Sequence, residues 1–110
     1  MNEAAVKKTL GLISLCRRAG KLCTGMEAVL EKAERGEAAL ILLAEDLSLR
    51  SAKRLRNRLP EETPVRSLPC TMQTLSEVTG KAAGIIAVCD ENFACGIRAT
   101  LSDEEEDLDR

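Results

Sequence analysis

The chain has 110 residues, of which 45% are hydrophobic and 31% charged, with a formal net charge of −2. This size and composition predict one globular domain that can bury a core without disulfides or metal ions. Phe93 is the only aromatic residue, so a module that stacks bases on several aromatic side chains is excluded. The chain has no histidine, and it therefore lacks the commonest general base and the commonest zinc ligand.

Charge is distributed unevenly along the chain. Residues 103–110 contain six acidic residues and one basic residue, a composition typical of disordered segments. Without them, residues 1–102 are weakly basic, which is compatible with an RNA partner. We therefore expect a folded domain over residues 1–102 and a disordered acidic tail over residues 103–110.

The first third of the chain predicts a helix, a short strand and a second helix. Apolar residues at helical spacing predict a helix over residues 3–18, and residues 21–23 can form only a short strand. Thr24 and Glu27 follow in a capping-box pattern, in which each side chain bonds the backbone N–H of the other. A second helix is therefore expected to begin at Thr24.

A buried strand and a basic helix come next. Gly36 is a typical helix stop, and the apolar run 38–44 suits a strand buried on both faces. The turn Glu45-Asp46 ends this strand. Asp46 or Ser48 then caps a helix that reaches to about Leu59 and is rich in arginine and lysine.

The remaining elements repeat the alternation of strand and helix. Pro64 and Pro69 bound a short strand, which favours the edge of a sheet. Thr71 caps a short helix, residues 80–83 form a loop before a second apolar strand, and Asp90 caps a last helix that runs through about Ser102. The sequence therefore predicts an α/β protein: a three-layer α-β-α sandwich with a mixed sheet of about four strands and helices on both faces.

Catalytic and metal sites are not expected. The five cysteines form no CxxC pair and have no histidine to activate them, so we interpret them as reduced thiols that fill space. Glu45 and Asp46 are better explained as a turn and a cap than as metal ligands. The apolar run 10–16 is followed by Arg17-Arg18 rather than by a signal cleavage site, so a cytoplasmic protein is expected, with no membrane contact, cofactor or small-molecule substrate.

Two basic segments are candidates for contact with phosphate. Arg17, Arg18 and Lys21 lie close in sequence to the start of the second helix, whose free N–H groups and dipole favour anions. The helix over residues 50–58 also contacts phosphate if it is not simply a solvated face.

The order of these motifs resembles the ribosomal-protein family that binds kink-turn RNA, and especially its small bacterial YlxQ-like branch. The resemblance extends over most of the domain and rests on residues 10–12, 18–21, 24–27, 35–36, 40–46, 75–81 and 86–90, with 93–94. It implies the same α-β-α sandwich, together with recognition of an RNA kink at tandem sheared G·A pairs.

In the family, the start of the second helix reads guanine edges through the pattern G-x-(Asn/Asp/Glu)-(Glu or apolar)-x-x-Lys. Gly25 matches this pattern, Glu27 supplies an acceptor, and Ala28 fits the apolar option. Glu31 stands where the family has lysine, so a carboxylate replaces an ammonium, and Lys32 is an imperfect substitute because it points about 100° further round the helix. The resemblance implies an RNA-binding set made of Arg17, Arg18, Lys21, Thr24, Gly25, Met26, Glu27, Ala28, Glu31, Lys32, Glu45, Asp46, Gly80, Lys81 and Ala82.

Two functions follow from this pattern. The first is a non-catalytic protein that binds ribosomal or other structured, kink-turn-like RNA. The second is a protein-interaction module that keeps the fold but has weakened or lost RNA recognition, with Glu31 as the motivating residue and with helix 50–58 or the acidic tail as the contact. The orientation of Glu31, onto the Gly25–Glu27 surface or toward Arg35, is the structural observation that bears on this choice most directly.

Overall fold

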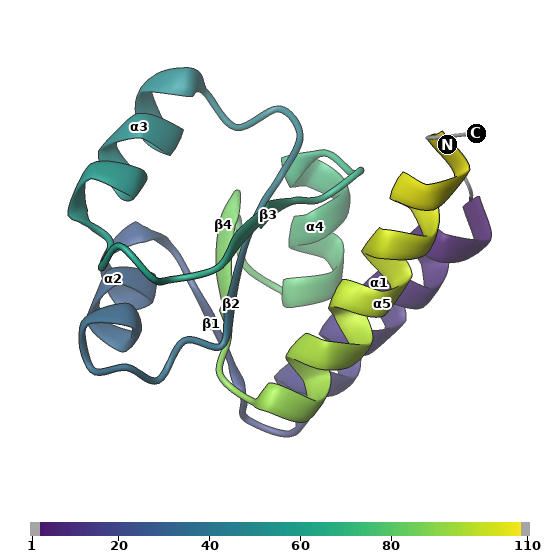
Figure 1. Cartoon of the computed structure of the whole chain (residues 1–110), viewed down its shortest axis with the longest axis horizontal. Helices are drawn as coiled ribbons and strands as arrows, with labels where there is room; N and C mark the ends of the chain where they lie inside the picture. The colour runs from purple at the N-terminus through teal and green to yellow at the C-terminus, as the bar shows by residue number, and fades with distance from the viewer. Residues whose placement is uncertain (1–2, 109–110) are drawn as a thin grey trace.

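The computed structural model describes the backbone of residues 3–108 and the side chains of residues 3–101. Helices and strands alternate along almost the whole chain (Figure 1). In chain order the elements are α1 (Glu3–Arg18), β1 (Leu22–Thr24), α2 (Met26–Glu34), β2 (Leu40–Leu43), α3 (Leu49–Arg58), β3 (Val65–Ser67), α4 (Met72–Thr79), β4 (Ile85–Val88) and α5 (Glu91–Leu108).

The four strands form one mixed sheet in the order β1-β4-β2-β3. β2 pairs with β3 in parallel, whereas β4 runs antiparallel to both of its neighbours, β1 and β2. β3, the strand between the two prolines, lies at an edge, where a missing backbone donor costs least. The central strands β2 and β4 are buried at every residue, as their unbroken apolar runs predict.

Alternate side chains of the central strands enter two separate cores. Leu40, Leu42, Ile86 and Val88 pack with residues of α1, α4 and α5 on one face, while their neighbours Ile41, Leu43, Ile85 and Ala87 pack with α2 and α3 on the other. Figure 1 shows the same division, with α2 and α3 on one side of the sheet and α1, α4 and α5 on the other. The predicted three-layer sandwich with a four-stranded mixed sheet is therefore confirmed.

Most helix boundaries agree with the sequence prediction. α1 has the expected bounds, Ser48 and Thr71 cap α3 and α4 by accepting the backbone N–H groups of Ser51 and Thr74, and Asp90 accepts the N–H of Phe93 at the start of α5. Gly36 follows α2 with a φ of 74°, a conformation that glycine adopts without strain.

The end of α5 differs from the prediction. We expected the helix to stop near Ser102, but it continues to Leu108 and includes residues 103–108 of the acidic run, while residues 109–110 lie outside the described residues. No glycine or proline occurs between Gly96 and Leu108 to stop the helix. The prediction that the last helix ends near Ser102 is therefore wrong.

Candidate nucleic-acid interface

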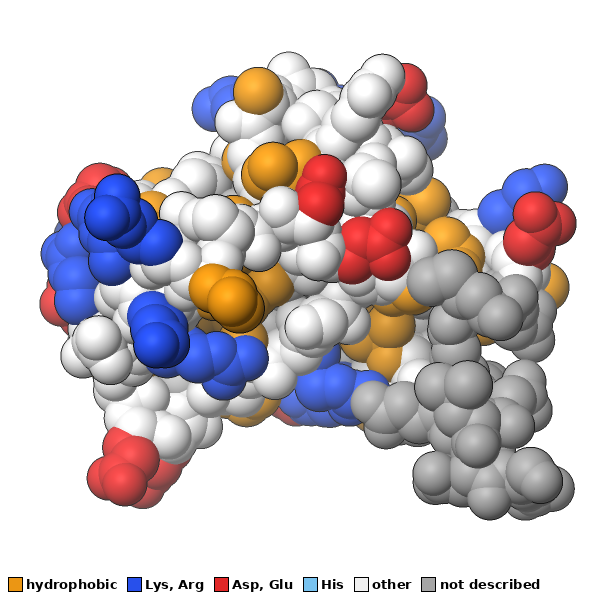
Figure 2. Space-filling view, turned by 90° about the horizontal axis from the view of Figure 1, so that it is seen from above, with side chains coloured by type: hydrophobic (Ala, Val, Ile, Leu, Met, Phe, Trp, Pro, Cys, Tyr) orange, Lys and Arg blue, Asp and Glu red, His pale blue; other side chains and the backbone are white. Residues whose placement is uncertain are grey.

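Three of the segments singled out by sequence meet at one end of the sheet. The N–H of Gly25, directly after β1, donates to the carbonyl of Ile85, and the N–H of Ala44, directly after β2, donates to the carbonyl of Gly84. The start of α2, the turn Glu45-Asp46 and the loop before β4 therefore share one end of the sheet, the upper end in Figure 1. Figure 2 looks onto this end from above.

The start of α2 is formed by backbone rather than by a capping side chain. Gly25, not Thr24, is the N-cap residue, with φ 93° and ψ 150°, and none of the described side chains caps it. The predicted capping box is wrong because Thr24 belongs to β1, where it pairs with Ile86, and Glu27 points to another helix. The first N–H groups of α2 are consequently left without a capping acceptor, as an anion-binding helix start requires.

Glu27 is held by an arginine of α3. Nη1 of Arg58 donates to Oε2 of Glu27 at 3.0 Å, and Nη2 donates to Oε1 at 3.4 Å. The guanidinium and the carboxylate therefore form a bidentate pair. The hydrogen bond and charge of Arg58 hold the pKa of the Glu27 carboxyl below its usual value. Glu27 is thus an ionised acceptor at neutral pH, and its side chain remains largely exposed.

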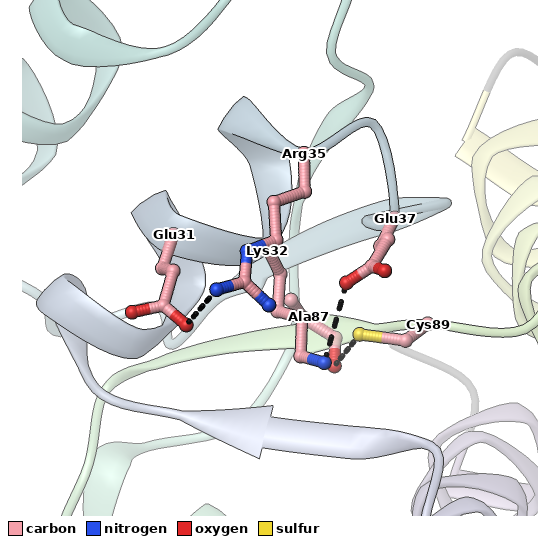
Figure 3. A network of polar contacts seen from close by, with 6 residues as sticks. All are labelled: Glu31, Lys32, Arg35, Glu37, Ala87 and Cys89. Carbon is pink, nitrogen blue, oxygen red and sulfur yellow. Dashed lines mark hydrogen bonds and ion pairs between the residues drawn. The ribbon is translucent and has the colours of Figure 1, made fainter.

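Glu31 turns away from the start of its helix. Oε1 of Glu31 lies 3.4 Å from Nη2 of Arg35, one turn further along α2 (Figure 3). Both side chains are more than half exposed, and such a pair is worth about 0.3–0.5 kcal/mol, so a ligand could displace it easily. The carboxylate that replaces the family lysine therefore does not occupy the surface at Gly25.

A shallow hollow brings together residues from four elements. It has a volume of about 320 Å³ and lies between the end of α1, β1, the start of α2 and the loop that follows α4. Its lining residues are Arg17, Leu22, Cys23, Thr24, Ala28, Thr79 and Lys81. Four of these, namely Arg17, Thr24, Ala28 and Lys81, belong to the set expected to bind RNA.

The Arg17 side chain lies against the end of α4. Nη1 of Arg17 donates to the carbonyl of Val78 at 3.3 Å, which places the guanidinium at the negative end of α4. Gly80 ends α4 with φ 77°, and a Cβ at this position would lie 2.6 Å from Nη2 of Arg17. The positive φ favours glycine here, whereas the flexible end of the Arg17 side chain could shift to make room for a Cβ.

Thr79 was missed in the sequence analysis, and Arg58 was named there only as part of the basic helix 50–58 and not as a partner of Glu27. The buried Oγ1 of Thr79 donates to the carbonyl of Lys81 at 3.0 Å and so shapes the exposed segment of Lys81 and Ala82. A threonine two residues before a loop carbonyl is a weak signal for such a turn. Nothing local predicts the contact between Arg58 and Glu27, which are 31 residues apart in sequence.

Lys21 and Lys32 lie away from Gly25. They line a second hollow of about 220 Å³ with Gly20, Glu37 and Cys89. Nζ of Lys32 is 3.4 Å from Oε1 of Glu37. Figure 3 draws this ion pair as a dashed line. Contrary to the sequence-based grouping, Lys21 does not lie beside the start of α2. The strand β1 separates Lys21 from Gly25 by about 13 Å, at 3.3 Å per residue. Arg18 is exposed at the end of α1, whereas Met26, the first residue of α2, is partly buried against the core between the sheet and helices α2 and α3.

The Glu45-Asp46 turn is tied to α4. Oδ1 of Asp46 accepts the backbone N–H of Met72 at 2.8 Å, and the N–H of Glu45 donates to the carbonyl of Cys70. The idea that Asp46 caps α3 is wrong, since Ser48 does so. Both acidic side chains remain exposed at the site end of the sheet.

The buried thiols are poor nucleophiles. Burial raises the pKa of Cys16 and of Cys23 to about 11, and it also raises the pKa of Cys70. A thiol with such a pKa is almost entirely protonated at pH 7. Among the described residues, no three cysteine, aspartate or glutamate side chains are grouped as metal ligands, and no helix there is long and apolar enough to cross a bilayer.

The fold and this end of the sheet define a class of α-β-α proteins, and comparison with known proteins gives the family. The family model described as ribosomal protein L7Ae/L30e/S12e/Gadd45 matches residues 7–97. The chain therefore belongs to this family. The RNA-binding protein YlxQ of Enterococcus faecium is 28% identical over 98 residues, which cover 86% of this chain and 91% of that protein.

Solved structures agree on the fold. A Bacillus halodurans protein of unknown function superposes with a TM-score of 0.78 at 29% identity, covering 86% of this chain and 97% of the other. The 15.5kD RNA binding protein of Giardia lamblia has a TM-score of 0.69 at 14% identity, covering 96% of this chain and 92% of the other. At 14% identity, the similarity to the Giardia lamblia protein shows the fold alone.

Proposed function

We propose that this protein is a non-catalytic, cytoplasmic RNA-binding protein that recognises a kinked, structured RNA, of ribosomal or other origin, at the start of α2. The observation that carries the proposal is the uncapped helix start at Gly25, with the ionised acceptor of Glu27 beside it. Backbone N–H groups there suit a phosphate, and the carboxylate suits a guanine edge or an exocyclic amino group. The family membership and the YlxQ relative support RNA as the partner.

The two sides of α2 would serve different contacts. On one side, the hollow with Arg17 and Lys81 presents cations to the backbone of the RNA. On the other, Glu27 reads a base while Arg58 keeps its carboxylate oriented. Phosphate contacts then set the register, and Glu27 supplies the specificity.

Glu31 favours a second candidate, a protein-interaction module in which RNA recognition is weakened. Its carboxylate lies one turn from Glu27 and lowers the positive potential where the family pattern has lysine. Under this alternative, α3 or the acidic run would contact a protein. If neither the full chain nor a chain lacking residues 103–110 binds kinked RNA, this second function replaces the first.

The variant Glu31→Lys tests the proposed site. We expect it to tighten binding to a kink-turn RNA about tenfold, or by about 1.4 kcal/mol, because it removes a repulsive carboxylate and adds a phosphate ligand. The measurement is a fluorescence-anisotropy titration at fixed salt, with a straight duplex of equal length for comparison.

Glu62→Lys is the matched control. It makes the same change of charge in the exposed loop before β3, at the end of the sheet opposite to Gly25. This variant should tighten binding to both RNAs slightly and equally. Equal effects of the two variants on the kinked RNA would contradict the placement of the site at α2.

A further inference from the structure

The basic face of α3 has no role in the site described above, apart from Arg58. The helix contains no acidic residue, and Leu55 is its one fully buried side chain. Five cationic side chains, all exposed, project from its ten residues: Arg50, Lys53, Arg54, Arg56 and Arg58. Figure 2 shows basic side chains gathered over α3, at the left of the face that also holds the end of the sheet.

Three of these arginines form a continuous row. Arg50, Arg54 and Arg58 are spaced four residues apart, so each lies one turn beyond the last and only about 40° round the helix. Like charges at this spacing destabilise a helix. Among the described side chains, only Arg58 of this row forms an ion pair. Arg50 and Arg54 therefore carry positive charge that no ion pair among the described side chains neutralises.

The row is continuous with the proposed RNA site. Its end at Arg58 contacts Glu27 at the start of α2, and the charge of Arg54 also helps to lower the pKa of Glu27. From there the row extends about 12 Å along α3 to Arg50, at 1.5 Å per residue. A nucleic-acid strand that reaches Glu27 would thus meet a line of guanidinium groups.

We propose that Arg50 and Arg54 of the α3 arginine row (Arg50, Arg54 and Arg58) bind successive phosphates of the RNA helix that leaves the site at Glu27, while Arg58 joins the row to Glu27. This inference rests on the proposed function and extends its footprint from α2 to α3. Guanidinium groups match phosphate oxygens in a bidentate manner and stay charged at all physiological pH values. The absence of aromatic and acidic side chains from α3 fits a phosphate backbone better than a mixed protein surface.

Two arginines on the same helix provide a matched test. Arg54 lies in the row, whereas Arg56, equally an exposed arginine of α3, points about 160° away from it round the helix. We expect Arg54→Gln to weaken binding to kinked RNA three- to tenfold and to reduce the slope of log K against log salt by about 0.7–0.9. Arg56→Gln should change the affinity by less than twofold and the slope by less than about 0.2. Equal losses from the two variants would overturn the proposal, as would no loss from either.

The same titrations on a straight duplex separate this inference from the proposed function. If the wild-type protein fails to prefer the kinked RNA, the proposed function fails. The difference between Arg54→Gln and Arg56→Gln on the straight duplex would then still support the arginine row, and its absence would still overturn it. Unchanged RNA affinity of Arg54→Gln, together with weaker binding to an acidic polyglutamate peptide, would assign the row to a protein partner instead. Melting temperatures of both variants that equal that of the wild-type protein establish that the fold is intact.

Discussion

Replacement of Glu27 by alanine is expected to weaken binding to kinked RNA by roughly 5- to 150-fold, or about 1–3 kcal/mol, with little loss on a straight duplex. The magnitude is that of one well-placed contact to a base edge. The direction of the change in RNA affinity is informative because the variant also removes a negative charge. A protein that binds phosphate only by charge would bind both RNAs more tightly after this change.

Two further variants of α2 control this result. Glu27→Gln keeps one acceptor oxygen and should lose only part of the affinity. Glu34→Ala removes an exposed acid of the same helix two turns away and should not weaken binding. Tighter binding of Glu27→Ala to kinked RNA would contradict a base-reading role for this carboxylate, and the Kd values from anisotropy titrations decide between the two results.

Replacement of Gly25 by alanine should damage both stability and RNA binding. The φ of 93° and ψ of 150° lie in a region that is essentially restricted to glycine, so a side chain costs about 1–3 kcal/mol of folding free energy. A Cβ at Gly25 would meet no atom of the described structure within 4 Å, so the cost comes from the backbone alone. Relaxation of this strain would move the first N–H groups of α2, and we expect binding to kinked RNA to weaken at least tenfold.

Gly36 offers the matched control at the other end of α2. It also has a positive φ and open space where a Cβ would lie, but it is away from the proposed site. Gly36→Ala should lower the free energy of unfolding by about 1–2 kcal/mol while leaving RNA affinity within twofold. Urea denaturation and RNA titration of both variants are the measurements. Equal RNA affinities of the two folded variants would contradict a role for the helix start.

The fold could be predicted because its signals are local and agree with one another. The runs that became β2 and β4 are unbroken apolar stretches of strand length, and Ser48, Thr71 and Asp90 occupy positions where a short polar side chain can accept a helix N–H. The edge position of β3 followed from its flanking prolines. Each of these features depends on residues close together in sequence.

The details of the site could not be predicted because they depend on contacts between distant residues. Thr24 and Glu27 have the spacing of a capping box, but Thr24 joins a sheet ladder and Arg58 captures Glu27. Asp46 likewise serves α4 rather than the helix that follows it in sequence. In each case a tertiary contact replaced the contact that the local pattern predicts. The sequence therefore identified the residue but not its partner.

The most direct test of the proposed function is a titration of the full wild-type chain with a kink-turn RNA and with a straight duplex in which Watson–Crick pairs replace the tandem sheared G·A pairs. We predict at least tenfold tighter binding to the kinked RNA, with a ratio that persists as salt is raised, because phosphate contacts are common to both RNAs. Equal and strongly salt-dependent binding to the two RNAs would contradict recognition of the kink.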